Sequence, residues 1–298
     1  MPGVQPRSVL SGMLVKEAMR RQVVQLPAGA SIAKGINYLL KFKVNALLIA
    51  DEGRPPAGVV SKTDLIGAYY AGLPTDTSLG DVMTGPPLIC YPDDELESAL
   101  DRMRSRAVHR LYVTGADAAT LIGTLSYTDV VALLYRYCRA CPKSISRRAV
   151  FEEPGDEGRR LTVKEVMTSS VVSFPEGAAL ALVIEGLTAH RFGAVLICSN
   201  RGEPRGVISK TDLIRAYHHG VGLEAEARTI MTAPVVAWDA SAFLWEALRH
   251  MFLQDVQRLF VHAGDPARIT GVLSLSDAAR VRSGSCRACM PSRFMVPA

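Results

Sequence analysis

This chain of 298 residues contains no long hydrophobic run. Its longest apolar stretches, such as residues 46–50, are far shorter than the roughly 18 residues that a membrane-spanning helix needs. Residues 1–13 contain no apolar segment of the kind found in secretory signals. We therefore expect a cytoplasmic protein that has no membrane partner.

The sequence also lacks the short motifs that mark common catalytic sites. It has no P-loop, no H-E-x-x-H zinc motif, no G-x-S-x-G nucleophile turn and no G-x-G-x-x-G dinucleotide motif. Its six histidines form no cluster with the spacing of metal ligands. These absences favour a binding protein over an enzyme.

The composition is that of a folded globular chain. Hydrophobic residues make up 48% and charged residues 21%, which argues against disorder, and the length suggests about two domains. The net charge of +5 is small. Its densest basic tract comprises Arg136, Arg139, Lys143, Arg147 and Arg148. So short a tract suits a solvated linker better than a nucleic-acid site, so a nucleic-acid-binding regulator is the weakest of our hypotheses.

One motif occurs twice in almost unchanged form. GVVSKTDLI at residues 58–66 and GVISKTDLI at 206–214 share eight of nine letters and lie 148 residues apart. Two weaker copies, GTLSYTDVV from Gly123 and GVLSLSDAA from Gly271, have the same offset of 148. A fixed offset indicates a duplication. Because each half contains two copies about 65 residues apart, the chain is predicted to hold four units in two pairs.

Each unit is predicted to fold as strand–helix–strand–strand–helix. In the first unit, apolar residues 22–26, 46–50 and 57–60 indicate strands, while helices are expected after Ser31 and Ser61. The units are placed at residues 13–72, 80–141, 161–220 and 228–290, with a charged linker at 142–160. Apolar strands covered by helices predict a mixed α/β (α+β) fold.

This pattern resembles the cystathionine β-synthase (CBS) domain family. The resemblance rests on G-h-h-S-x-x-D at the last strand-to-helix turn, V-x-x-x-M at 15–19, VMT at 82–84 and AVHRLYV at 107–113. It covers nearly all of residues 13–282 and implies four β-α-β-β-α CBS repeats in two tandem pairs. Such pairs form a disc with a pseudo-two-fold axis, a layout similar to that of the gamma subunit of AMP-activated protein kinase. The resemblance also implies clefts for adenosine-containing ligands such as AMP, ADP, ATP or S-adenosylmethionine.

The Ser-x-x-Asp turn suits such a ligand. A helix N-terminus presents unpaired N–H groups to phosphate, and the Ser61 hydroxyl can donate a further hydrogen bond. Asp64 carries two acceptor oxygens for ribose hydroxyls. The same two residues also form a capping box, which needs no ligand, and a duplication copies caps as faithfully as sites. Lys62 and Lys210 could reach a phosphate, but solvated lysines at a helix start are an equal alternative.

Basic residues divide the clefts into two classes. His109 and Arg110 precede one strand of the second unit, and Arg258 has the matching place in the fourth. The family resemblance places this position across the cleft from the phosphates, although an exposed strand start explains it without a ligand. We predict ligand contacts from Ser61, Thr63, Asp64, His109 and Arg110 in one half, and from Ser209, Thr211, Asp212 and Arg258 in the other.

The remaining predicted contacts are weaker. The clefts of Ser126 with Asp129, and of Ser274 with Asp277, lack a basic partner and are second-tier sites. Val24 and Val172 are predicted to line the adenine slot, although core packing explains both valines equally well.

Two Cys-x-x-Cys pairs end the two halves. They are Cys138 with Cys141 and Cys286 with Cys289. Because the sequence shows no secretory signal, a metal-binding or redox role is favoured for these cysteines over a structural disulfide. If the two pairs met, their four thiolates would suit zinc or an iron–sulfur cluster, although free thiols at a frayed helix end explain them too.

The sequence thus predicts a non-catalytic regulatory sensor that binds AMP, ADP or ATP and acts on a protein partner in trans, with a homodimer as one assembly. A metal-linked or redox-linked assembly protein built on the cysteine pairs is the alternative.

Overall fold

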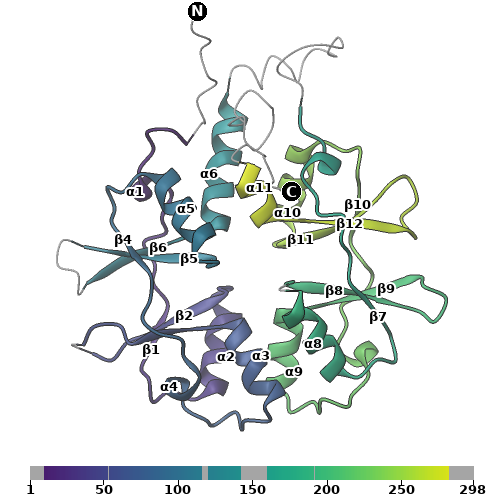
Figure 1. Ribbon diagram of the computed structural model, residues 1–298, viewed down its shortest axis with the longest axis horizontal. Coiled ribbons are helices and arrows are strands. Elements are labelled where there is room, and N and C mark those ends of the chain that lie inside the picture. The colour runs from purple at the N-terminus through teal and green to yellow at the C-terminus, as the bar shows by residue number, and fades with distance from the viewer. Residues whose placement is uncertain (1–9, 53, 116–119, 142–159, 191, 282–298) are drawn as a thin grey trace, which may run out of the picture.

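The computed structural model describes residues 10–52, 54–115, 120–141, 160–190 and 192–281. None of the helices in these ranges is both long and apolar enough to cross a membrane. Four three-stranded sheets occupy the four quarters of a disc, and helices pack between them and at the edges (Figure 1). The predicted mixed α/β fold of four units in two pairs is confirmed.

The four units repeat one order of elements. The first comprises β1 (Gln25–Leu26), α2 (Ile32–Lys41), β2 (Ala46–Ile49), β3 (Gly58–Ser61) and α3 (Lys62–Tyr70). The second comprises β4 (Ile89–Cys90), α5 (Leu96–Ser105), β5 (Arg110–Thr114), β6 (Leu121–Ser126) and α6 (Tyr127–Ala140). The third comprises β7 (Ser173–Pro175), α8 (Leu180–Ala189), β8 (Ala194–Cys198), β9 (Pro204–Ser209) and α9 (Lys210–His218). The fourth comprises β10 (Ala237–Asp239), α10 (Leu244–Leu253), β11 (Arg258–His262), β12 (Ile269–Ser274) and α11 (Leu275–Val281).

Each sheet has the same pairing. The first strand is parallel to the second, and the second is antiparallel to the third. β2 is buried along its whole length as the middle strand, which explains its uninterrupted apolar run. Its first residue, Ala46, pairs with Ser61 at the end of β3. The start of each middle strand therefore lies beside the serine that begins the next helix.

Capping side chains set where helices begin. Ser31 accepts a hydrogen bond from the backbone N–H of Lys34 at 3.3 Å, so the predicted start of α2 is confirmed. β1 is shorter than predicted, because only Gln25 and Leu26 of residues 22–26 have the regular strand pairing to β2.

Helices of the two halves pack against each other across the pseudo-two-fold axis. α3 contacts α9, and α6 contacts α11. The rings of Tyr69 and Tyr217 stack with centroids 4.9 Å apart. Each hydroxyl donates to the other half, Tyr69 to the Val221 carbonyl at 2.5 Å and Tyr217 to the Leu73 carbonyl at 2.6 Å.

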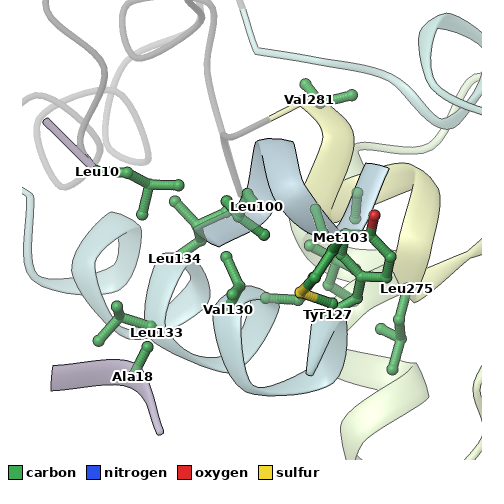
Figure 2. Packing of buried hydrophobic residues seen from close by; sticks show 14 of the residues in the cluster. Leu10, Ala18, Leu100, Met103, Tyr127, Val130, Leu133, Leu134, Leu275 and Val281 are labelled. Carbon is green, nitrogen blue, oxygen red and sulfur yellow. The ribbon is translucent and has the colours of Figure 1, made fainter. Parts of the chain in front are cut away.

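Each large hydrophobic core is built from both halves. One joins the first unit to the third, and the other joins the second unit to the fourth. Figure 2 shows part of the second core, where Met103 of α5 and Val130 of α6 lie near Leu275 of α11. Burial of apolar surface is the main stabilising term in folding, so the two halves depend on each other for stability.

The segment that leads into each unit packs on the other unit of its pair. The short helix α1 (Val15–Ala18) contacts α5 and α6, and Arg20 bridges to Thr124. In return, α4 (Leu79–Val82) contacts α3 and β3, and Thr84 bridges to Val59. Short 3₁₀ turns at Val163–Glu165 and Ala227–Thr229 precede the same exchange in the second half. The repeat in the sequence does not indicate this exchange.

Candidate functional site

All four Ser-x-x-Asp turns are capping boxes. In the first unit, Asp64 Oδ2 accepts from the Ser61 backbone N–H at 2.7 Å and from Ser61 Oγ at 2.6 Å. The Ser61 oxygen in turn accepts from the N–H groups of Thr63 and Asp64. In the other three turns, the carboxylates of Asp129, Asp212 and Asp277 likewise accept from the backbone N–H and the hydroxyl of Ser126, Ser209 and Ser274. The serine proton is thus committed to the cap, unlike the free phosphate donor that we predicted.

The cap leaves the second carboxylate oxygen for other partners. Thr84 Oγ1 lies 3.4 Å from Asp64 Oδ1, and Thr232 Oγ1 lies 3.4 Å from Asp212 Oδ1. Gly58 allows the segment that contains Thr84 to lie this close to the first unit. A Cβ added to the glycine would lie only 2.9 Å from the Thr84 carbonyl oxygen. We did not predict a role for either threonine. The sequence feature that could have identified these threonines is the Met-Thr pair at 83–84, which recurs 148 residues later at 231–232.

Arg110 and Arg258 each reach into the neighbouring unit of their own pair. Arg110 Nη1 donates to the Ala46 carbonyl at 3.2 Å, next to Ser61 in the sheet register. The Arg258 guanidinium lies against Gly193, where a Cβ would overlap it. Burial lowers the pKa of Arg258, and Asp277 opposes that shift. Both arginines therefore lie beside the start of a middle strand in the neighbouring unit, near the residue that pairs with the serine of its Ser-x-x-Asp turn.

Lysines from the two halves cross the centre of the disc. Lys62 Nζ donates to Thr211 Oγ1 at 2.8 Å, and Lys210 Nζ donates to Thr63 Oγ1 at 2.7 Å. Burial lowers the pKa of Lys62 to about 8, with Arg258 and Arg215 contributing and Asp212 opposing the shift. The pKa of Lys210 is lowered by burial and by Arg258. These lysines are therefore not the solvated helix-start residues of our alternative interpretation.

His109 joins a group of basic side chains drawn from all four units. Desolvation lowers its pKa, and so do the charges of Lys210, Arg258 and Arg280, which favours the neutral imidazole at neutral pH. We call Lys62, Lys210, His109 and Arg258 the central cation cluster, in which His109 becomes a cation only when it is protonated. Mutual repulsion and desolvation disfavour these charges, so an anion bound among them would be stabilised electrostatically.

The two second-tier clefts have arginine counter-ions already. Arg20 forms an ion pair with Asp129, whose side chain is buried. Arg280 Nη1 lies 3.7 Å from Asp277 Oδ1. Asp212 has a comparable contact, because Arg215 Nη1 lies 3.7 Å from its Oδ1, so an arginine partner does not by itself separate the two classes of cleft.

Val24 and Val172 are partly buried and pack against the core shared by the first and third units. Their carbonyls accept sheet hydrogen bonds from the N–H groups of Leu48 and Leu196 at 3.0 Å. The segment that contains Thr84 lies beside Asp64. The adenine slot at the two valines stays a prediction.

The cysteine prediction is only partly covered by the described residues. Cys138 is buried on α6 and Cys141 follows that helix, whereas Cys286 and Cys289 lie outside the described residues. Within the described ranges, no three or more His, Cys, Asp or Glu residues are grouped so as to hold a metal ion. The four-thiolate site stays a prediction. Cys90 and Cys198 are buried in their sheets.

Comparison with known proteins gives the same fold. The family model of the CBS domain matches residues 15–71, 79–136 and 163–219, which is more than half of the chain. The fourth unit lies outside these ranges but has the same element order and strand pairing.

Two similar sequences come from archaea. An uncharacterised 33.4 kDa protein from the ribosomal RNA operon of Thermofilum pendens is 24% identical over 190 residues, 63% of this chain and 59% of that protein. This chain therefore spans less than two thirds of that relative's length. The uncharacterised protein MJ1225 of Methanocaldococcus jannaschii is 21% identical over 206 residues, 68% of this chain and 69% of that protein.

Solved structures agree in fold over nearly the whole chain. MJ1225, described as a proposed archaeal homologue of the AMP-activated protein kinase gamma subunit, superposes with a TM-score of 0.72 at 16% identity, covering 90% of this chain and 99% of that one. A conserved uncharacterised protein from Pyrococcus horikoshii gives 0.58 at 17% identity, covering 91% and 100%. At such identities these likenesses establish the fold alone.

Proposed function

We propose, from the premise that the chain belongs to the CBS domain family, that it is a regulatory module which binds an adenine nucleotide and has no catalytic role. The observation that carries the proposal is the central cation cluster, which lies between two Ser-x-x-Asp turns. The cluster can offset the charge of phosphate groups, and the turns supply acceptors for ribose. A nucleotide is a ligand with both chemistries in one molecule.

The contacts in the first cleft can be assigned atom by atom. Asp64 Oδ1 and Thr84 Oγ1 are 3.4 Å apart and together offer an acceptor and a hydroxyl to the ribose. Arg110 lies at the Ala46 carbonyl and would face the phosphates, with His109 and Lys210 toward the disc centre. Asp212, Thr232 and Arg258 make the corresponding set in the second half.

Regulation would follow from the ligand's position between units. A nucleotide held by the first unit and by Arg110 of the second makes both sets of contacts in only one relative orientation. Differential affinity then shifts the population of pair geometries, and a protein partner in trans reads the shift. We expect AMP, ADP and ATP to differ in affinity, because each added phosphate brings further charge to the central cation cluster.

The test replaces Asp64 and Asp212 together by asparagine. An amide oxygen can keep the cap with the serine N–H, so the helix starts should survive. Each lost charge-assisted hydrogen bond should weaken binding by about 1.5–3 kcal/mol, which is roughly 10-fold to 100-fold in Kd. Calorimetric titration of AMP, ADP and ATP measures the change, and thermal melting checks the fold.

Asp277→Asn is the matched control. It removes the same charge from a Ser-x-x-Asp turn that none of the proposed nucleotide contacts uses, so nucleotide affinity should not change. Equal nucleotide affinity in the Asp64→Asn/Asp212→Asn double variant and the unmodified chain would overturn the assignment of these clefts.

A further inference from the structure

Three of the four Ser-x-x-Asp aspartates have an arginine partner. These pairs are Asp129 with Arg20, Asp212 with Arg215, and Asp277 with Arg280. Asp64 is the exception, since it forms no ion pair with any residue in the part of the chain that the structure describes. Three positions after Asp64 the sequence has Gly67, where the third unit has Arg215.

A hollow of about 420 Å³ lies beside Asp64. Its wall is formed by Asp64 and Gly67 of α3, Ala71 directly after that helix, Val82 of α4 and Thr188 of α8. A Cβ added at Gly67 would meet no atom within 4 Å, so the space above the glycine is open. Apart from Asp64 and two threonines, the lining is small and apolar.

The third unit shows what fills the equivalent space. The counterparts of Gly67, Ala71 and Thr188, each displaced by 148 residues, are Arg215, His219 and Leu40. All three are larger, and Arg215 Nη1 lies 3.7 Å from Asp212 Oδ1. The fold thus contains its own example of a guanidinium beside this carboxylate.

We infer that the hollow beside Asp64 is a receptor site for an arginine side chain supplied by a partner polypeptide. The carboxylate matches the planar guanidinium, and the small apolar wall accommodates the aliphatic stem. Gly67, Ala71 and Thr188 are exposed, so the site is reachable from a protein surface.

A lysine would fit less well. An ammonium group is compact and strongly hydrated, whereas a guanidinium is weakly hydrated and can present two parallel donors to one carboxylate. The site shares the Asp64 carboxylate with the proposed ribose contact, so nucleotide and guanidinium would compete for it, but it adds Gly67, Ala71 and Thr188, which no proposed nucleotide contact uses.

The experiment titrates N-acetyl-L-argininamide into the ¹⁵N-labelled full chain without nucleotide and follows the Gly67 and Ala71 amide signals. We expect saturable shifts at both amides, and none with the neutral isostere N-acetyl-L-citrullinamide. Gly67→Arg should abolish the shift at Ala71, because the chain then fills the hollow as the third unit does. The substitution has room, so thermal stability should be retained.

Arg215→Gly is the reciprocal variant. It should open a second hollow beside Asp212 and add a second set of saturable shifts at residues 215 and 219. Citrullinamide acting like argininamide, or Gly67→Arg leaving the Ala71 shift in place, would overturn the proposal. So would an Arg215→Gly variant that gains no site.

The source of the guanidinium is tested separately. The capped probe represents an arginine within a polypeptide, whereas free L-arginine carries a charged amino group and carboxylate. Binding of the capped form at least as tight as that of free arginine supports a partner polypeptide. A free arginine that binds about tenfold more tightly would instead identify a small-molecule site and refute that part of the inference.

Discussion

The ammonium group of Lys62 has a pKa of about 8 because burial near the disc centre disfavours its charge, with help from Arg258 and Arg215. The ordinary value of 10.5 applies to the unfolded chain, so between pH 8 and 10.5 the unfolded state binds more protons. The free energy of unfolding of the unliganded protein should therefore rise with pH across this window, as far as Lys62 is concerned.

Nucleotide binding should raise the lowered pKa of Lys62 again, so the protein should take up a proton when the nucleotide binds. At pH 8 Lys62 is about half protonated, and a nearby phosphate favours the charged form. Titration calorimetry in buffers of different ionisation enthalpy should show proton uptake at pH 8. The part of the uptake that is due to Lys62 should fall toward zero at pH 6, where Lys62 already carries its proton.

Lys62→Met separates this group from the other cations. The variant should lose the uptake at pH 8, whereas Lys16→Met, which removes an exposed lysine, should keep it. Undiminished uptake in Lys62→Met would assign the proton to another group.

Gly193 shows how one residue can decide where a charge lies. Any side chain at this position would overlap the Arg258 guanidinium. The first unit has Asn45 at the corresponding place, and Asn45 donates instead to Gln257 at 3.1 Å. The absence of a side chain is therefore the feature that admits the arginine to the second half's cleft.

At the scale of elements, the exchanged leading segments bring Thr84 and Thr232 to the two cleft aspartates. Their backbones hold them there through bridges to Val59 and Val207, so the hydroxyls can be removed without disturbing the chain path. Two isolated β-bridges thus connect the exchanged leading segments to the strands that precede the cleft aspartates.

Thr84→Val with Thr232→Val tests the role of these segments. Valine keeps the shape and removes only the hydroxyl, so nucleotide affinity should fall by about 0.5–1.5 kcal/mol, the net value of a hydrogen bond. Calorimetry measures the affinity. The matched control is Thr162→Val, in which the hydroxyl contacts Glu165, away from both clefts. Similar affinity changes in both variants would mean that the threonines at 84 and 232 do not touch the ligand.

At the scale of the whole molecule, each of the two large hydrophobic cores combines residues from both halves. A half-chain would expose the face of α3 that packs on α9 and the face of α6 that packs on α11. Because the halves are near copies, a second identical half presents much the same surface. The disc is therefore a pseudo-symmetric version of a two-fold dimer.

Residues 1–141 expressed alone should form a homodimer through α3 and α6. Tyr69 should stack on its own copy in place of Tyr217. Size-exclusion chromatography with light scattering gives the mass, and Tyr69→Ala, which removes the stacked ring, should weaken the dimer. A stable monomer with native helix content would show that the shared cores are not required for folding.

Much of the architecture could be predicted because it is local or repeated. Hydrophobic period, Ser caps and a constant offset of 148 residues mark the strands, the helices and the four-unit layout. The exchange of leading segments could not be predicted, because sequence order does not show which unit a segment packs on. The second-tier clefts and the adenine slot at Val24 and Val172 stay predictions.

The sequence by itself determined the repeat, the α/β class, and the turns where serine and aspartate meet, because these depend on neighbours a few residues apart. Only the tertiary structure decided which residues share a site. Contacts such as Lys62 with Thr211 join positions 149 residues apart, and no local pattern encodes them. The open space beside Gly67 is likewise a property of three packed helices. It exists because small residues from distant segments face one another there.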